Sequence, residues 1–263
     1  MVMNALPASV DAPATLRLLS CNILAGASVG RYHEYITRSW SAVLPGKHKR
    51  SNLDRLARAI AEFDVIGLQE ADAGSMRSGF LNQTQYLAEA SGLPYWSHQP
   101  NRRISHVAHS ANGLISRVEP SEVLDYPLPG RMGGRGVLLA RYGVGRDALL
   151  VAIAHLSLGP QARARQLAFI AELLDGHPNV VLMGDLNCDP GSAELRMLLA
   201  RTALAAPHAP PPTFPSWRPQ RAIDHILVSG GIAVERMWTL PDAFSDHLPL
   251  AAQIRLPAAQ ASA

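Results

Sequence analysis

The chain is poor in the residues that cross-link a protein or anchor it in a membrane. Only two of its 263 residues are cysteines, Cys21 and Cys188, and each lies in or beside an apolar run. A disulfide scaffold would use more cysteines, so we expect two buried free thiols and a reducing, cytoplasmic compartment. Residues 1–14 have no basic start, and no apolar run has the length needed to cross a bilayer. We therefore expect neither a signal peptide nor a transmembrane segment.

Charge is sparse and nearly balanced. The 24 Lys and Arg residues exceed the 21 Asp and Glu residues by only three, which excludes a strongly basic surface as the dominant feature. The basic residues are mostly Arg, whose guanidinium group suits bidentate binding of phosphate. No internal repeat, low-complexity tract or clear linker interrupts the chain. We expect a single domain over residues 15–256, with a loose leader at 1–14 and a tail at 257–263.

Apolar runs of strand length outnumber helical patterns, and neighbouring runs are often joined directly. This mixture predicts an α/β fold of packed mixed sheets flanked by helices. Helical spacing of apolar residues predicts helices near residues 51–60, 83–90, 160–174 and 192–200. The expected strands cover residues 16–23, 65–69, 112–116, 122–124, 135–141, 149–154, 180–183, 223–228, 232–238 and 248–254.

A polar pair follows the apolar run Val180–Met183, where Gly184 is followed by Asp185 and Asn187. Two residues at this spacing point to the same side of an extended chain, so a carboxylate and an amide would lie together. The alternative is an Asx turn that simply ends the strand. Other expected strands also end, or begin, at polar residues, and these are Asn22, Glu70, His155, Asp224, Asp246 and His247.

If these strand ends converge, they form a site lined by oxygen ligands and imidazoles. Carboxylate and amide oxygens suit Mg²⁺ or Mn²⁺, whereas zinc would call for more His or Cys ligands. The histidines would then serve in proton transfer and charge stabilisation, with Asp224 orienting His247. Taken singly, each residue is explained about as well by a turn, a solvated strand end or a half-buried histidine. Their joint order is what indicates a site.

Seven segments carry a resemblance to a known group. The pattern resembles the endonuclease/exonuclease/phosphatase superfamily from about Leu16 to Ile254. The resemblance implies a four-layer α/β/β/α sandwich and a phosphoesterase that depends on Mg²⁺ or Mn²⁺. The matching segments are residues 20–22, 67–70, 112–116, 154–156, 184–187, 222–226 and 245–249.

The resemblance also implies a ligand set for the metal ion. Glu70 would be the main ligand, helped by Asn22 and by Asp246, either directly or through water. The reaction it implies is in-line attack of water on a phosphodiester or a phosphomonoester.

The same likeness assigns roles around the phosphate. Asp185 and Asn187 would position the attacking water and the phosphate, and His155 would hydrogen-bond a phosphate oxygen. Asp224 and His247 would form a polarised pair beside the scissile phosphorus. Either Asp185 or His247 would take the proton of the water, and the sequence leaves both open. One departure is that the sequence shows no second acidic partner for His155, which the deoxyribonuclease branch would have.

Three residues are candidates for substrate binding: Arg77, Asn112 and Trp217. Arg77 lies in a Gly- and Ser-rich loop directly after Glu70 and is equally well explained as a solvated loop residue. For Trp217 and its neighbour Phe214, core packing is the favoured reading, because large aromatic residues mostly serve burial.

The sequence leaves the substrate open. A nucleic acid is one candidate, because residues 47–50 are basic enough to follow a phosphate backbone. A phospholipid headgroup or a small phosphoester is the other, with Tyr32, Tyr35 and Trp40 in a lid. A hypothesis of another class is a binding module that has lost catalysis, and the complete set of site residues argues against it.

Overall fold

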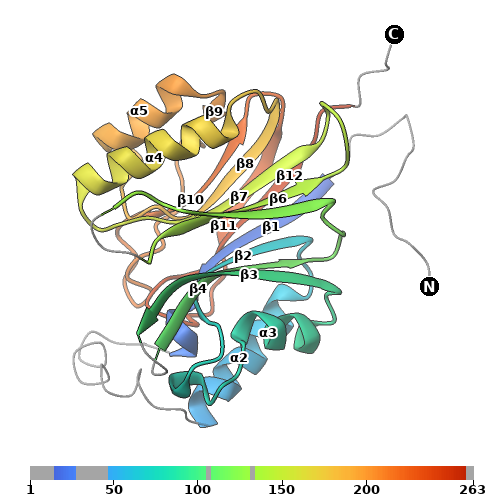
Figure 1. Ribbon diagram of the computed structural model, residues 1–263, viewed down its shortest axis with the longest axis vertical. Helices are drawn as coiled ribbons and strands as arrows, with labels where there is room; N and C mark the ends of the chain where they lie inside the picture. The colour runs from blue at the N-terminus through green and yellow to red at the C-terminus, as the bar shows by residue number, and fades with distance from the viewer. Residues whose placement is uncertain (1–14, 28–46, 105–107, 131–133, 259–263) are drawn as a thin grey trace.

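A computed structural model describes residues 15–27, 47–104, 108–130 and 134–258 of the protein. The expected leader at 1–14, the three aromatic lid residues and the last five residues of the expected tail lie outside these ranges. Two sheets pack face to face, and helices cover the outer face of each, so the chain forms four layers (Figure 1). The expected α/β/β/α sandwich is thereby confirmed.

The first sheet has six strands in the order β11-β12-β1-β2-β4-β3. It contains both a parallel pair, β1 with β2, and antiparallel pairs, so it is a mixed sheet. Its strands are β1 (Thr15–Asn22), β2 (Val65–Asp72), β3 (Tyr95–Ile104), β4 (Ala108–Ser116), β11 (Ala233–Thr239) and β12 (Leu250–Arg255).

The second sheet also has six strands, in the order β5-β6-β7-β8-β10-β9. Among its described strands, β7 and β8 run parallel, and the other neighbouring pairs run antiparallel. Its strands are β5 (Glu122–Pro127), β6 (Gly136–Tyr142), β7 (Leu149–His155), β8 (Asn179–Asp185), β9 (Leu204–Ala205) and β10 (Asp224–Ser229).

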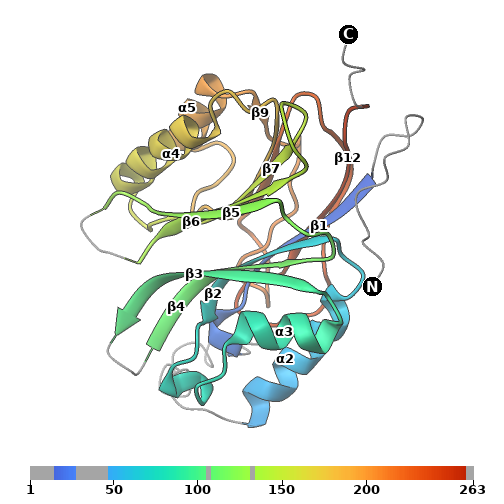
Figure 2. The same ribbon diagram turned by 45° about the vertical axis from the view of Figure 1, so that its right-hand side comes forward.

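The helices lie on the two outer faces (Figure 2). The first sheet is covered by α2 (Lys47–Ile60) and α3 (Gln83–Ser91), and the second by α4 (Pro160–Leu174) and α5 (Ala193–Arg201). Two short 3₁₀ turns, η1 (Leu24–Gly26) and η3 (Met76–Ser78), follow β1 and β2. Within the described ranges, no helix is both long and apolar enough to cross a membrane.

The central strands carry apolar side chains on both faces, and these side chains fill the space on both sides of each sheet. In β8, Val181 and Met183 pack between the two sheets, while Val180 and Leu182 pack towards α4 and α5. This follows from the two-residue period of a strand, and a run that is apolar throughout is therefore buried on both faces. At Gly67 the sheets approach so closely that an added Cβ would lie 3.0 Å from the Met183 side chain.

Two strands, β3 and β9, were not expected from the sequence, and β2 continues to Asp72, beyond its expected end at Gln69. β3 crosses a segment that reads as polar and contains Pro100, and β9 is only two residues long. β3 lies at the edge of its sheet, where proline is tolerated and one face need not be apolar. Because β3 is polar, a prediction based on apolar runs does not identify it as a strand.

The topology brings the polar strand ends together at one end of the sandwich. β1 and β2 run parallel, as do β7 and β8, so in each sheet a parallel pair ends at the same edge. β12 and β10 run antiparallel to β1 and β8, so they start where those strands end. In the second sheet, Asp185 is the register partner of both His155 and Asp224.

Candidate active site

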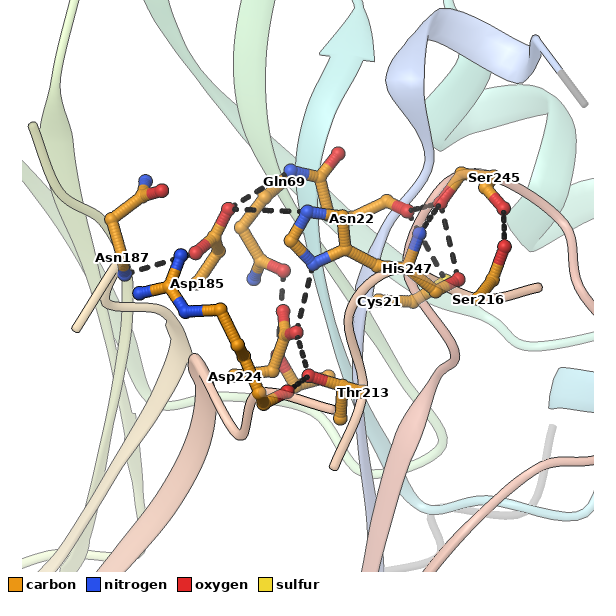
Figure 3. Close-up of polar contacts among 12 residues, drawn as sticks. Cys21, Asn22, Gln69, Asp185, Asn187, Thr213, Ser216, Asp224, Ser245 and His247 are labelled. Carbon is orange, nitrogen blue, oxygen red and sulfur yellow. Dashed lines mark hydrogen bonds and ion pairs between the residues drawn. The ribbon is translucent and has the colours of Figure 1, made fainter. Parts of the chain in front are cut away.

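A hydrogen bond across the two sheets joins the polar strand ends. The amide Nδ2 of Asn22, at the end of β1, donates to Oδ2 of Asp185, at the end of β8, over 3.1 Å (Figure 3). Both side chains are buried. The Oδ2 atom also lies 3.4 Å from Nε2 of His155 and 3.9 Å from Nε2 of His247. One carboxylate oxygen is thus surrounded by an amide and two imidazoles.

The pKa of Asp185 is lowered despite its burial. Burial alone would raise the pKa, but the hydrogen bond from His155 and the charge of His247 stabilise the carboxylate more strongly, and Asn22 adds a further donor. Asp185 is therefore ionised at neutral pH. It can accept hydrogen bonds but has no proton to donate.

The loop after β8 departs from the extended form that the sequence suggested. Asn187 has a φ of 53°, in the left-handed region, so it is not on an extended strand beside Asp185. Its backbone N–H donates to Oδ1 of Asp185 over 3.0 Å, which is an Asx turn, and its Nδ2 donates to the carbonyl of Leu156 over 2.9 Å. The extended conformation expected through Asn187 is not found, because the strand ends at Asp185. Asn187 instead ties the β8 loop to the loop after β7.

Glu70 is aimed by an irregularity in β2. Leu68 pairs with Gly113 and Ala71 with Ala111, so Gln69 and Glu70 together lie opposite the single residue between those partners. This is a β-bulge, and Glu70 has a φ of 56° within it. Left-handed backbone is strained for a residue other than glycine and is typical of functional sites. The Glu70 carboxylate lies 3.9 Å from Nε2 of His155 and is 29% exposed.

His247 and Asp224 form a buried pair at the starts of β12 and β10. Nδ1 of His247 lies 2.8 Å from Oδ2 of Asp224, and the hydroxyl of Thr213 donates to the same oxygen. Burial disfavours the charged imidazole, but the charge and hydrogen bond of Asp224, with Asp185 and Asp246 nearby, raise the pKa of His247 to about 10. His247 is therefore an imidazolium at neutral pH. The expected pairing of Asp224 with His247 is found in the structure.

Two neighbours hold this pair in place. The ring of Phe214 packs on the imidazole of His247 with a centroid distance of 4.9 Å. Ser245 donates its hydroxyl to the carbonyl of Asn22 and accepts from the backbone N–H of His247 (Figure 3). The sequence indicated Phe214 as a packing residue, and the structure shows that it packs against a site histidine. Trp217, three residues later, is half-buried.

Asp246 provides the test of whether this site fits a cation. Its carboxylate is 6% exposed, and within the described part of the chain Oδ1 has no hydrogen-bond partner. Burial raises its pKa to about 6, with His247 opposing and the negative charge of Glu70 adding to the rise. A buried, unpartnered carboxylate that is repelled by a second carboxylate is costly without a counter-ion. The residues at this edge therefore fit a divalent cation.

A second cluster of ligand atoms lies close by. Among the described residues, one oxygen or nitrogen atom each of Asp185, Asp224 and His247 lie within 4.8 Å of one another. The facing atoms of Asp224 and His247 already bond to each other. Oδ1 of Asp224 has no hydrogen-bond partner among the described residues, but the imidazolium of His247 lies against the other oxygen of this carboxylate and balances its charge. Asn22 already accepts from the Leu24 N–H through its Oδ1 atom.

Arg135 also contacts the site, although the sequence did not indicate it as a site residue. Nη1 of Arg135 lies 2.9 Å from Nδ1 of His155. Arg135 directly precedes β6, whose first residue, Gly136, is the register partner of His155. The sequence does contain a pattern that predicts this contact. Two apolar runs of equal length flank the turn at residues 143–148, which indicates a hairpin in which the start of β6 pairs with the end of β7.

The other two candidate substrate-binding residues, Asn112 and Arg77, have different environments. Asn112 is fully buried, and its Nδ2 donates to Gln99 and to the carbonyl of Gly136, while Oδ1 has no partner within the described ranges. Arg77 lies in η3, and its side chain lies outside the described part of the structure. The loop that carries it is fixed by the buried Asp72, which accepts from the backbone N–H groups of Gly74 and Ser75.

The two cysteines take no part in this chemistry. Cys21 and Cys188 are both buried and free. Burial raises the pKa of the Cys188 thiol to about 11 and also raises that of Cys21. Both thiols are therefore protonated and belong to the packed core.

Fold and site together define a class: a four-layer sandwich with a carboxylate–histidine cluster where the strands of both sheets meet. The model of the Endonuclease/Exonuclease/phosphatase family matches residues 19–247, and the chain belongs to this family. The match spans almost all the segments on which the resemblance was based.

Solved structures agree on the fold. An endonuclease/exonuclease/phosphatase from Beutenbergia cavernae is 23% identical with a TM-score of 0.74, over 94% of this chain and 73% of that one. A mannosyl-6-phosphatase from Bacteroides thetaiotaomicron is 20% identical with a TM-score of 0.65, over 91% and 99% of the two chains. The human Nocturnin catalytic domain with bound sulfate is 15% identical with a TM-score of 0.67, over 91% and 94%. No curated protein matches the sequence significantly.

Proposed function

We propose that this protein is a Mg²⁺- or Mn²⁺-dependent phosphoesterase that hydrolyses its substrate by in-line attack of water. The observation that carries the proposal is the environment of Asp185 Oδ2, which faces the Asn22 amide and the imidazoles of His155 and His247. Such a set of donors around one anionic acceptor suits the oxygens of a phosphoryl group. Family membership supports the same class, because endonucleases, exonucleases and phosphatases all cleave phosphoester bonds.

Each side chain has a role that follows from its charge. Asp185 is ionised and accepts the hydrogen bond of the attacking water, so it is the candidate that can take the proton. His247 is held as an imidazolium by Asp224 and stabilises the negative charge that grows on the phosphoryl oxygens. Of the two candidates for general base, the electrostatics favour Asp185, because His247 already carries its proton.

The metal ligands that we propose are Glu70 and Asp246, with Asn22 beside them. A bound Mg²⁺ or Mn²⁺ would supply positive charge to the phosphoryl and leaving oxygens. The chain contributes two buried or half-buried carboxylates that repel each other without a cation. Asn187 and Asn22 restrain the Asp185 carboxylate on either side, so the acceptor for the water is held before substrate arrives.

The substrate is tested by a panel with and without Mg²⁺ or Mn²⁺. The panel contains bis-p-nitrophenyl phosphate, single- and double-stranded DNA, RNA, sphingomyelin and inositol phosphates. Asp185→Asn should abolish turnover, whereas Asp189→Asn, four residues later in a half-exposed ion pair with Arg221, should not. If the protein hydrolyses no phosphoester with either ion, the proposal is refuted and a binding module is favoured.

Salt dependence separates the two substrate classes. A nuclease that contacts several phosphates should lose affinity steeply as salt rises, because counterions are released on binding. An enzyme for a small phosphoester or phospholipid headgroup should respond weakly. Two similar structures bear on this choice: one is described as a mannosyl-6-phosphatase, and another, Nocturnin, contains a sulfate ion, which resembles a phosphoryl group in shape and charge.

The state of the cysteines supports a cytoplasmic location, which we also propose. Both thiols are buried and free, as expected in a reducing compartment. Cell fractionation tests this, and recovery of the protein only from an oxidising or external fraction would contradict it.

A further inference from the structure

The guanidinium group of Arg135 contacts the imidazole of His155 on the side away from the site. Its Nδ1 lies 2.9 Å from Nη1 of Arg135, while Nε2 faces the site, 3.4 Å from Asp185 Oδ2 and 3.9 Å from Glu70 Oε1. The ring is 3% exposed, so bulk water does not compete for either nitrogen. The arrangement is opposite to that of His247, whose Nδ1 faces the carboxylate of Asp224.

The chemistry of guanidinium allows only one tautomer here. An arginine side chain has five N–H donors and no acceptor, so a hydrogen bond to Nδ1 requires a lone pair on that nitrogen. The ring proton then resides on Nε2, which faces the carboxylates of Asp185 and Glu70. We propose that Arg135 is the positioning residue that fixes His155 as the Nε2–H tautomer and directs this N–H into the site.

The fold holds the arginine in register with the histidine. Gly136, directly after Arg135, is the register partner of His155 in the β6–β7 hairpin. The carbonyl of Gly136 also accepts from Nδ2 of Asn112 over 2.9 Å, and Asn112 belongs to β4 of the other sheet. The start of β6 is thus held from both sheets, which keeps the guanidinium behind the imidazole.

The two histidines consequently act in different ways. A neutral imidazole held through Nδ1 donates one hydrogen bond from Nε2 and has no second proton to release. His155 would therefore orient a phosphoryl oxygen and would not protonate the leaving group. His247, backed by a carboxylate, provides positive charge instead. The catalytic part of this inference rests on the proposed phosphoesterase function, whereas the tautomer does not.

The direct test is long-range proton–nitrogen NMR of the histidine rings of the full chain. The His155 signals are identified by their loss in a His155→Asn variant. In the wild type we expect an unprotonated Nδ1 and a protonated Nε2. A proton on Nδ1 in the wild type would overturn the proposal without any appeal to activity.

Three variants make the test specific to the arginine. Arg135→Met keeps the length of the side chain and removes the donors, so the tautomers of His155 should mix and kcat should fall about 10- to 100-fold, the usual effect of losing a residue that orients a site ligand. Arg135→Lys should restore part of both signals. Arg141→Met, a substitution of an arginine at the far end of the same strand, should change neither.

The outcomes separate this inference from the proposed function. An unchanged tautomer in a folded Arg135→Met variant would refute the role of Arg135, whatever its activity. The expected tautomer in a wild-type protein that hydrolyses no phosphoester would refute the proposed function and leave the assignment of Arg135 intact. Dispersed amide spectra of each variant establish that it is folded.

Discussion

The buried pair of Asp224 and His247 permits a quantitative prediction for Asp224→Asn. The substitution keeps the shape of the side chain and an oxygen that can accept from His247, but it removes the charge that holds the imidazolium. A pKa raised from 6.5 to about 10 corresponds to about 5 kcal/mol, at about 1.4 kcal/mol for each pKa unit. Breaking a buried ion pair by removing one partner costs about 3–5 kcal/mol. We expect a loss of stability in this range at pH 7.

The pH dependence gives the prediction its sign. The folded-state pKa of His247 is above the unfolded value, so the pair stabilises the fold fully below pH 6.5 and loses this contribution as pH rises towards 10. The difference between wild type and Asp224→Asn should therefore shrink over this interval. Urea denaturation at several pH values measures it, and with an m-value of about 2 kcal/mol per M the midpoint should fall by about 1.5–2.5 M at pH 7.

A matched control is available four residues after Asp185. Asp189→Asn removes a carboxylate from a half-exposed ion pair with Arg221, which should cost at most about 1 kcal/mol at any pH. Only Asp224→Asn should also lower kcat, by about 10²- to 10⁴-fold, because His247 loses its charge and its fixed orientation. A difference in stability between wild type and Asp224→Asn that stays constant from pH 7 to pH 10 would refute the reasoning.

Three further predictions follow from the same site. Glu70→Ala should abolish activity and weaken Mg²⁺ binding in calorimetry without unfolding the chain, whereas Glu89→Ala, on the exposed face of α3, should do neither. Because burial raises the pKa of Asp246 to about 6, a proton competes with the cation, and Mg²⁺ affinity should fall about tenfold for each pH unit below 6; an affinity independent of pH would remove Asp246 from the ligands. Gly184→Ala should prevent folding, because the new Cβ would lie 1.9 Å from a backbone oxygen of β7, whereas Gly191→Ala meets nothing within 4 Å and should yield soluble protein.

The sequence by itself predicted the class of fold and pointed to most of the polar residues that the structure brings together at one end of the sandwich. Runs such as Val180–Met183 are apolar throughout, and such runs need cover on both faces, so packed sheets with helices outside were the consistent solution. Polar residues such as Asn22, Glu70 and Asp185 each follow a run of mostly apolar residues, and this local pattern is visible without coordinates. Strands with little apolar signal, above all β3 with Pro100, were not predicted for the same reason.

Only the tertiary structure decided how these side chains meet. The bulge that aims Glu70 and the left-handed backbone of Asn187 are local conformations that side-chain pattern does not encode. The contact between Arg135 and His155 arises because two strands pair in one particular register. The charge states follow in turn, since burial and partners set a pKa, and both depend on residues distant in sequence. Sequence pattern therefore determined which groups reach the strand ends, whereas register and burial determined what each group can do there.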